Sequence, residues 1–284
     1  MAHKQDPELE YDIEDESDTD DGRTDDIALK PGPNADAATD VEKYISQEVR
    51  ELYDVYSYRH AAAILATSFP DELAELEHAL LNFRITTRDI ATPGGNESVM
   101  PKKYSQTLRP KGWLEARIQG DLHVRMEQHD EQGLPNGKTK KFKRARSAPQ
   151  VIENFIDGHK IDYVKGRVAF DLEWNSKDQT FDRDLYAMRA FHECGLISLG
   201  VMVTRSEKLN PVFDDVQQLS KEGQPVLITK GTKAGQPQSV RAKYGASTTW
   251  MGKLLYRLNA GRHGGCPVLV FGITPKLIED WKHT

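Results

Sequence analysis

Residues 161 to 175, IDYVKGRVAFDLEWN, are typical of two short strands joined by a turn at Lys165 and Gly166. The two-residue period of a strand divides the second run into an apolar face and a polar face. The apolar face carries Val168, Phe170, Leu172 and Trp174, and the polar face carries Asp171, Glu173 and Asn175. An antiparallel turn would bring Asp162 beside these acids, and three crowded carboxylates are costly to ionise without a cation. We therefore predict a divalent metal that prefers oxygen ligands.

Length and composition allow a large folded unit. The chain has 284 residues and 38% hydrophobic content, enough for one large or two ordinary domains. No apolar run approaches the roughly 20 residues of a membrane span, and the N-terminus has no signal pattern. We therefore expect a cytoplasmic protein. Cys194 and Cys266 are far apart and lack metal-ligand spacing, which favours buried thiols over a disulfide or a zinc site.

Charge is unevenly distributed along the chain. Residues 1–40 hold 14 acidic and 3 basic side chains of the 44 and 38 in the whole chain, which leaves 30 acidic and 35 basic side chains in residues 41–284. A segment this acidic and poor in aromatic residues cannot bury enough apolar surface to fold, so we predict a disordered tail over 1–40. The tail could mimic nucleic acid and shield a basic cleft, or it could only increase solubility.

Residues 41–100 are expected to be a helical part. Apolar residues recur at steps of three and four from Val41 to Tyr56, which predicts one helix capped by Asp40. A second helix is expected after Pro70, with acids in its first turn. The stripe on the first helix could pack in the core, or it could form the contact of a symmetric dimer.

Residues 101–150 are expected to be a basic strand and loop region. Residues 101–146 contain 12 Lys and Arg residues against five acids, and the run GLPNGKTKKFKRAR is typical of a turn followed by a basic strand. Such a run would neutralise phosphates beside a duplex, although basic runs also occur as solvated surface. The candidate contacts to the DNA backbone are Lys140, Lys141, Lys143 and Arg144.

Residues 151–284 are expected to be the catalytic core of a single domain over 41–284. One helix is predicted to be capped by Ser176 or Asp178 and to end at Gly195, and another to be capped by Ser247 or Thr248 and to end at Gly261. Residues 197–204 and 266–273 are almost wholly apolar, which is typical of strands buried on both faces. The order αβββαβ predicts an α/β fold in which helices flank a mixed β-sheet.

An acidic strand with basic flanks suits phosphodiester cleavage. That reaction needs a cation to neutralise charge on the phosphate, an activated water, and a group that holds the water in line. Asp162 and Glu173 can hold the metal, while Asn175 can position water but cannot act as a base because an amide does not titrate. The spacing of the acids also allows Asp171 to take a ligand role.

These residues carry a resemblance to a known family. Asp162 and the run Glu173-Trp174-Asn175, in αβββαβ order, resemble the PD-(D/E)XK endonuclease fold. The strings EWNSKDQTFDRDL, KYGASTTWMGKL and GRHGGCPVLVFGITP resemble the BglII/BstYI-like type II restriction endonucleases, over roughly residues 41 to 280. The resemblance implies an Mg²⁺-dependent homodimer that cuts double-stranded DNA at a short palindromic site, which could contain GATC. A cognate DNA methyltransferase is expected in the same restriction-modification system.

The resemblance also implies site residues. The implied catalytic residues are Asp162, Glu173 and Asn175, and the implied metal ligands are Asp162, Glu173 and Trp174. Asn175 stands where the wider fold has lysine and the BglII branch has glutamine. The implied DNA-reading residues are Ser176, Lys177 and Asp178 after the catalytic strand, and Lys243, Ser247, Thr248 and Thr249 in a later loop. Ser176 and Asp178 could instead only cap the following helix.

Two other functions remain open from the sequence. The Asn175 departure is compatible with a DNA-binding protein that has lost catalysis, and the fold also hosts repair or mobile-element nucleases with little sequence preference. The paired acids Asp162 and Glu173 favour the endonuclease, because a non-catalytic protein has no reason to keep both of them on a strand.

Overall fold

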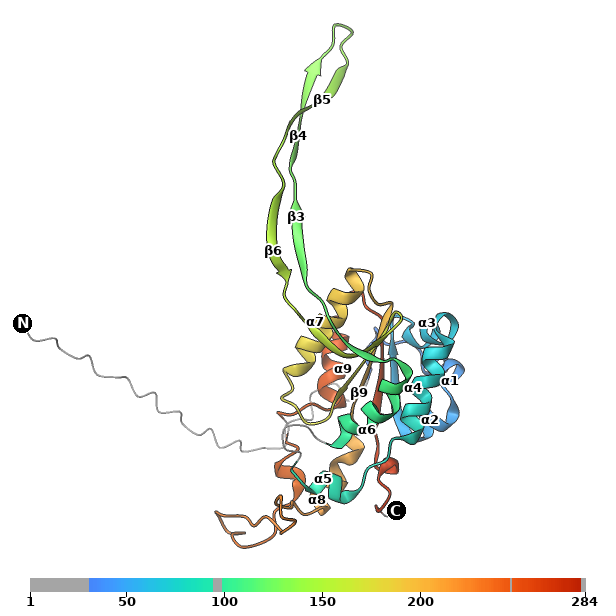
Figure 1. Ribbon diagram of the computed structural model, residues 1–284, viewed down its shortest axis with the longest axis vertical. Coiled ribbons are helices and arrows are strands. Elements are labelled where there is room, and N and C mark those ends of the chain that lie inside the picture. Colours follow the sequence, from blue (N-terminus) through green and yellow to red (C-terminus); the bar gives the residue numbers. More distant parts are fainter. Residues whose placement is uncertain (1–30, 94–98, 246, 282–284) are drawn as a thin grey trace, which may run out of the picture.

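A computed structural model of the chain describes residues 31–93, 99–245 and 247–281. Figure 1 shows a body of helices around a sheet, from which a long two-stranded ribbon projects. None of the helices in the described ranges has the length and apolar character that crossing a bilayer requires.

The body is built on a six-stranded mixed sheet in the order β1-β10-β9-β8-β7-β2. The parallel strands β8, β9 and β10 form its centre, and β1, β7 and β2 run antiparallel to their neighbours. The bounds are β1 Tyr53–Tyr58, β2 Leu114–Arg117, β7 Lys160–Lys165, β8 Val168–Glu173, β9 Leu199–Arg205 and β10 Val268–Ile273. The predicted α/β fold with a mixed sheet is confirmed.

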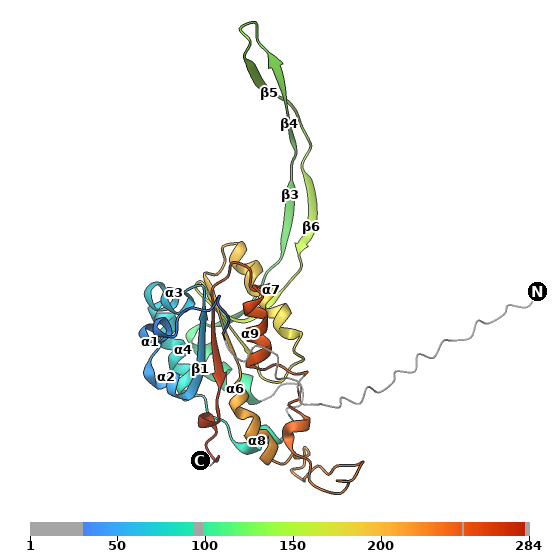
Figure 2. The same cartoon turned by 180° about the vertical axis from the view of Figure 1, so that it is seen from behind.

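Helices cover both faces of this sheet. Figures 1 and 2 show α1 to α4 on one side and α7 and α9 on the other. The bounds on the first side are α1 Ala38–Tyr44, α2 Gln47–Leu52, α3 Ala61–Ser68, α4 Pro70–Asn82 and α6 Val99–Leu108. On the second side they are α7 Thr180–Glu193 and α9 Met251–Asn259, while the short α5 Thr87–Ala91 and α8 Asn210–Asp215 lie near one end of the sheet. Each face buries its own apolar cluster.

The alternation predicted for residues 168 to 175 positions the acids. Phe170, Leu172 and Trp174 belong to the cluster under α4 and α6, whereas Ala169 belongs to the cluster under α7 and α9. Side chains on a strand point alternately to the two faces. The intervening Asp171 therefore lies on the α7 side.

The single helix predicted from Val41 to Tyr56 is wrong. Ile45 has extended backbone angles, φ −109° and ψ 133°, and separates α1 from α2. Strand β1 then pairs with β10. Apolar residues at these spacings suit both two short helices and an edge strand, and pairing with β10 decides the outcome. The stripe packs in the core of the same chain: Val41, Ile45, Val49 and Tyr53 are buried.

The predicted boundary at residue 40 lies too far along the chain. Gly32 N donates to Asn259 Oδ1 at 2.9 Å, and Ala35 forms a β-bridge with Tyr58. These contacts attach residues 31–40 to the body. The disorder predicted for residues 1–30 lies outside the described residues.

The ribbon in Figure 1 is a long arm formed by residues 120–156. Strand β3 Gly120–Val124 pairs with β6 Gln150–Ile156, and β4 Glu127–Gly133 pairs with β5 Thr139–Arg146. At the tip, Leu134 O accepts from Gly137 N at 3.0 Å and Leu134 N donates to Lys138 O at 2.6 Å. Gly137 has φ 74°, which a three-residue hairpin loop requires at this position. The predicted turn and basic strand are therefore confirmed as one hairpin.

Candidate active site

The antiparallel pairing of β7 and β8 brings two carboxylates face to face. Tyr163 is paired with Phe170, so the next step along both strands places Asp162 opposite Asp171. The two carboxyl groups share a hydrogen bond, and Asp171 Oδ1 also accepts from Leu172 N at 3.0 Å. Asp162 is exposed, while Asp171 is only 4% exposed. The predicted gathering of acids at this hairpin is present, with Asp171 as the direct cross-strand neighbour of Asp162.

Helix α7 adds a buried acid that the sequence reasoning missed. Phe181 and Leu185 hold α7 in the apolar cluster, and the same helical face carries Asp184, which is 1% exposed. Arg183 Nη2 lies 3.0 Å from Asp184 Oδ1 and 3.7 Å from Glu173 Oε1. The signal was present in the sequence, because Asp184 is three residues after Phe181 on the face that must be buried.

Asp162, Asp171, Glu173 and Asp184 together form the carboxyl cluster, and burial makes this cluster difficult to ionise. Burial, followed by the charges of Asp184 and Asp162, raises the pKa of Asp171 well above its usual value. Burial also raises the pKa of Glu173, against hydrogen bonds that lower it. Burial and the neighbouring Glu173 raise the pKa of Asp184 to about 8. The group can hold a full set of negative charges only when a cation compensates them.

The donor atoms of the cluster suit a hard divalent cation. Glu173 Oε2 and Asp184 Oδ2 are buried, and the only hydrogen bond between their side chains is the one that a protonated Asp184 can donate to Glu173; neither oxygen has another partner among the described residues. The side-chain ligand atoms of the cluster are all carboxylate oxygens, as Mg²⁺ prefers. Within the same residues, no three His, Cys, Asp or Glu side chains already converge as a metal site. The carboxylates would therefore have to turn toward a shared cation.

Trp174 and Asn175 follow Glu173, the last residue of β8, and Asn175 lines the same cleft as Glu173. The indole of Trp174 is buried on the opposite face of the sheet, where Nε1 donates to Tyr244 Oη at 3.2 Å. The side chain of Trp174 therefore cannot reach the metal, and the part of this residue that could serve as a ligand is its main-chain carbonyl. Asn175 Nδ2 donates to Lys243 O at 3.4 Å, and Asn175 Oδ1 is buried without a partner among the described residues.

The two segments expected to read DNA lie side by side. Lys177 forms an antiparallel bridge with Thr248. On either side of it, Asp178 N donates to Ser247 O at 2.9 Å and Thr249 N donates to Ser176 O at 2.8 Å. The Ser176 hydroxyl also bonds the Glu173 carboxylate, which links this pair of segments to the acidic cluster.

Several of these predicted readers are engaged within the protein. The Asp178 carboxylate lies 3.5 Å from Lys253 Nζ and 3.6 Å from Arg257 Nη2. Lys243 Nζ donates to Ile90 O and Thr92 O at 3.3 and 2.9 Å. Thr248 accepts from Arg205 at 2.6 Å, and Thr249 is buried. Lys177 and Ser247 are the exposed members of the set.

Comparison with known proteins decides the family. The family model described as "Restriction endonuclease BglII/BglIII" matches residues 53–273, which run from β1 to β10 and include the whole carboxyl cluster. The chain belongs to the BglII family of restriction endonucleases. It is therefore a type II site-specific deoxyribonuclease, and its substrate is DNA. A search of curated proteins gave no match.

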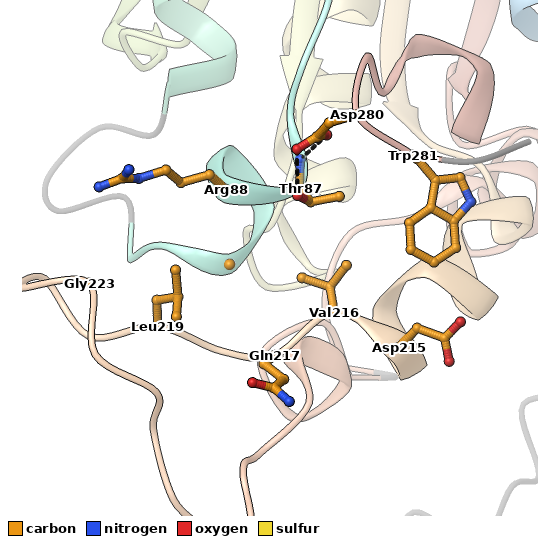
Figure 3. A pocket seen from close by; sticks show the side chains of 10 residues that line it. Thr87, Arg88, Asp215, Val216, Gln217, Leu219, Gly223, Asp280 and Trp281 are labelled. Atoms are coloured by element: carbon orange, nitrogen blue, oxygen red, sulfur yellow. Dashed lines mark hydrogen bonds between the residues drawn. The ribbon is translucent and has the colours of Figure 1, made fainter.

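A basic cleft adjoins the acidic strand of this BglII-family enzyme. It has a volume of about 880 Å³ and is lined by the end of β8 and by Arg88, Lys102, Lys221 and Lys243. A second pocket of about 850 Å³ lies on the far side of α5 (Figure 3). There Asp280 accepts from the N and Oγ1 of Thr87, both at 2.7 Å, and Asp215 is the other acid. Phosphate suits the first cleft, where four basic side chains outnumber Asp89 and Glu173, better than the second, where Asp215 and Asp280 outnumber Arg88.

The four predicted backbone contacts on β5 lie on the arm, away from this cleft (Figure 1). Three of them have acidic partners on the arm: Lys141 with Glu131 at 3.4 Å, Lys143 with Glu127 at 2.5 Å, and Arg144 with Asp130 at 3.5 Å. Lys140 has no ion pair with any described residue. Exposed pairs of this kind are worth about 0–1 kcal/mol, so phosphate can replace the acids.

Proposed function

We propose that this BglII-family enzyme is an Mg²⁺-dependent endonuclease that cuts both strands of a short palindromic site as a homodimer. The observation that carries the proposal is the carboxylate pair of Asp162 and Asp171 on adjacent strands, with Glu173 one strand step further along. An exposed acid beside two buried acids is a poor structural arrangement without a cation. It is a suitable one for holding metal next to a phosphate.

In this proposal Asp162 and Glu173 hold the metal, and Asp171 shares the ligand role. Support for Asp171 comes from its position directly opposite Asp162. When bound, Mg²⁺ would neutralise charge on the scissile phosphate and lower the pKa of a water molecule. Asp184 and Arg183 position the Glu173 carboxylate from α7. Asn175 orients a water through its unpartnered Oδ1, from a side chain held by Lys243 O.

Base readout is assigned mainly to Lys177 and Ser247. Both are exposed and both lie on the joined segments beside Glu173. A lysine ammonium donates to guanine O6 or N7, and a serine hydroxyl can pair with several base edges. Ser176, Asp178, Thr248 and Thr249 shape these segments, and Lys243 lines the adjoining basic cleft. A palindromic site that could contain GATC, and a cognate methyltransferase that protects the host site, complete the proposal.

Digestion of plasmid DNA tests the function directly. Incubation with Mg²⁺ should yield discrete fragments, and EDTA should abolish them because the carboxyl cluster then lacks its cation. A smear would indicate a nuclease with little sequence preference. DNA binding without cutting, under all divalent cations, would indicate a non-catalytic DNA-binding protein and contradict the proposal.

A further inference from the structure

The arm of residues 120–156 begins and ends beside the carboxyl cluster. Strand β6 ends at Ile156, and β7 begins at Lys160, two residues before Asp162. Strand β3 begins at Gly120, shortly after β2, which pairs with β7. The arm is therefore joined to the sheet close to Asp162, and Figure 1 shows that it extends away from α5 and α8 at the other end of the body.

The arm exposes several large apolar side chains. Every residue of β5 is exposed, and so are seven large apolar side chains of the arm. These are Val124, Met126, Leu134, Phe142, Val151, Ile152 and Phe155. A two-stranded hairpin is marginally stable in water without a third strand or a packed helix. The arm is therefore expected to gain order from a partner.

The tip of the arm, residues 134–140, differs in charge from the shaft that the rest of the arm forms. Lys141, Lys143 and Arg144 on the shaft are paired with acids of β4, but Lys138 and Lys140 have no ion pair with described residues. Leu134 is 38% exposed and precedes Pro135 in the hairpin turn. Apolar side chains flanked by unpaired lysines are complementary to duplex DNA, which carries phosphates on its outside and stacked bases in its interior.

The arm is long enough to act far from the cleavage site. From Gly120 to Asn136 the strands span roughly 50 Å at about 3.3 Å per residue. This length corresponds to about 15 base pairs of duplex at about 3.4 Å each. A ribbon of this width fits a DNA groove, and apolar wedges such as Leu and Pro enter the minor groove between base steps.

We propose that the arm is a DNA clamp that lies along the duplex and inserts its tip into the minor groove. Leu134, supported by Pro135, is the wedge at a base step, and Lys138 and Lys140 contact the flanking phosphates. This inference rests on the proposed function, because the arm takes the same DNA as the carboxyl cluster. It adds a binding site and a local bend outside the cleavage site.

A tethered cleavage reagent tests the position of the tip. A hydroxyl-radical-generating iron chelate is attached at Asn136→Cys in a Cys194→Ser background, and the complex with a 40-base-pair duplex, a length chosen to exceed the arm's reach of about 15 base pairs, is formed without divalent cation. The matched control carries the chelate on Cys194, which is exposed after the last turn of α7. We expect DNA cuts from the tip label and none from the control label. Intact DNA with the tip label, or cuts in the polypeptide of a second copy, overturns the proposal.

This outcome is separate from that of the plasmid digestion. Cuts from the tip label by a protein that leaves plasmid intact with Mg²⁺ would support the clamp and contradict the nuclease. Plasmid cleavage with no cuts from the tip label would support the nuclease and contradict the clamp. Both results are interpretable without knowing the recognition sequence.

Substitution of the wedge tests the bend. We expect energy transfer between two dyes about 15 base pairs apart, one on each side of the tip's contact, to rise when the unaltered protein binds, and the rise to be lost with Leu134→Ser. Leu196→Ser is the control, since Leu196 is 50% exposed and precedes the start of β9, at the end of the sheet opposite to Glu173. Lys138→Ala and Lys140→Ala should each reduce the salt slope of binding by about 0.9. Unchanged energy transfer with Leu134→Ser would show that the tip does not bend DNA.

Discussion

Asp171 is the residue whose role changes most between the sequence and the structure. It is buried, lies opposite Asp162 and has a strongly raised pKa. A neighbouring cation stabilises the ionised form of a buried carboxyl, so we expect Asp171 to bind the metal together with Asp162. Removal of either carboxylate should therefore have a similar effect on catalysis.

We predict that Asp162→Asn, Asp171→Asn and Glu173→Gln each lower the cleavage rate by orders of magnitude. DNA affinity should be retained or increased, because repulsion between the acids and phosphate is relieved. Single-turnover cleavage and binding without metal measure the two effects. Asp215→Asn, an exposed acid in the second pocket, is the control and should cut normally. Cleavage near the normal rate by all three variants would exclude this cluster as the active site.

Asn175 should affect the water and not the metal. Its amide is held by Lys243 O, and its Oδ1 has no partner among the described residues. Asn175→Ala should slow cleavage while the Mg²⁺ concentration for half-maximal rate stays unchanged. A titration of rate against Mg²⁺ measures both quantities. A shift in that concentration with an unchanged maximal rate would place Asn175 among the metal ligands.

His263 should make stability depend on pH. Burial lowers its pKa, and Nδ1 donates to Cys266 O at 2.7 Å. Below pH ~6.5 the unfolded chain takes up a proton that the folded His263 resists, so stability falls as pH decreases through this range. His263→Gln should reduce the loss of urea stability between pH 7 and pH 5. An unchanged loss in the variant would assign it to other groups.

At the scale of elements, the basic strand β5 and the reading segments should leave different signatures. Replacing Lys140, Lys141, Lys143 and Arg144 with Ala should weaken binding to cognate and random duplexes about equally, with a salt slope flatter by about 0.9 per lost contact. Lys177→Ala should cost about 1–3 kcal/mol on the cognate duplex and little on random DNA. Salt titrations on both duplexes measure this. If Lys177→Ala weakens binding to the cognate and the random duplex equally, Lys177 contacts phosphate and does not read a base.

Elements with their own periodicity could be predicted from the sequence. Strands β8, β9 and β10 and helices α7 and α9 have unambiguous apolar patterns and turn signals, and all five are confirmed. The first helix was wrong because Tyr53–Tyr58 becomes a strand only through pairing with β10, far along the chain. Asp184 was missed because its proximity to Glu173 depends on how α7 packs on the sheet. The turn in the arm was predicted, but the length of the arm follows from strand pairing that local patterns do not determine.

At the scale of the whole molecule, the Val41 to Tyr56 stripe is largely buried in the core, so the proposed dimer is expected to form through another surface. We predict that Val49→Ala lowers the free energy of unfolding by about 2 kcal/mol, because it leaves a cavity, without changing the sedimentation of the protein. A palindromic site read symmetrically requires two copies, so sedimentation at micromolar concentration should show a dimer. A monomer at every concentration, still cutting both strands in one encounter, would contradict the proposed assembly.

The pairing of the first strand with the last has a consequence for synthesis of the enzyme. Tyr53 pairs with Ile273, so β10 lies between β1 and the catalytic strands. During translation the six-stranded sheet cannot be completed until β10, Val268–Ile273, has left the ribosome. Pairings so distant in sequence also fold slowly. A chain that stops before β10 therefore lacks both the strand that pairs with β9 beside the catalytic strands and the strand that holds β1.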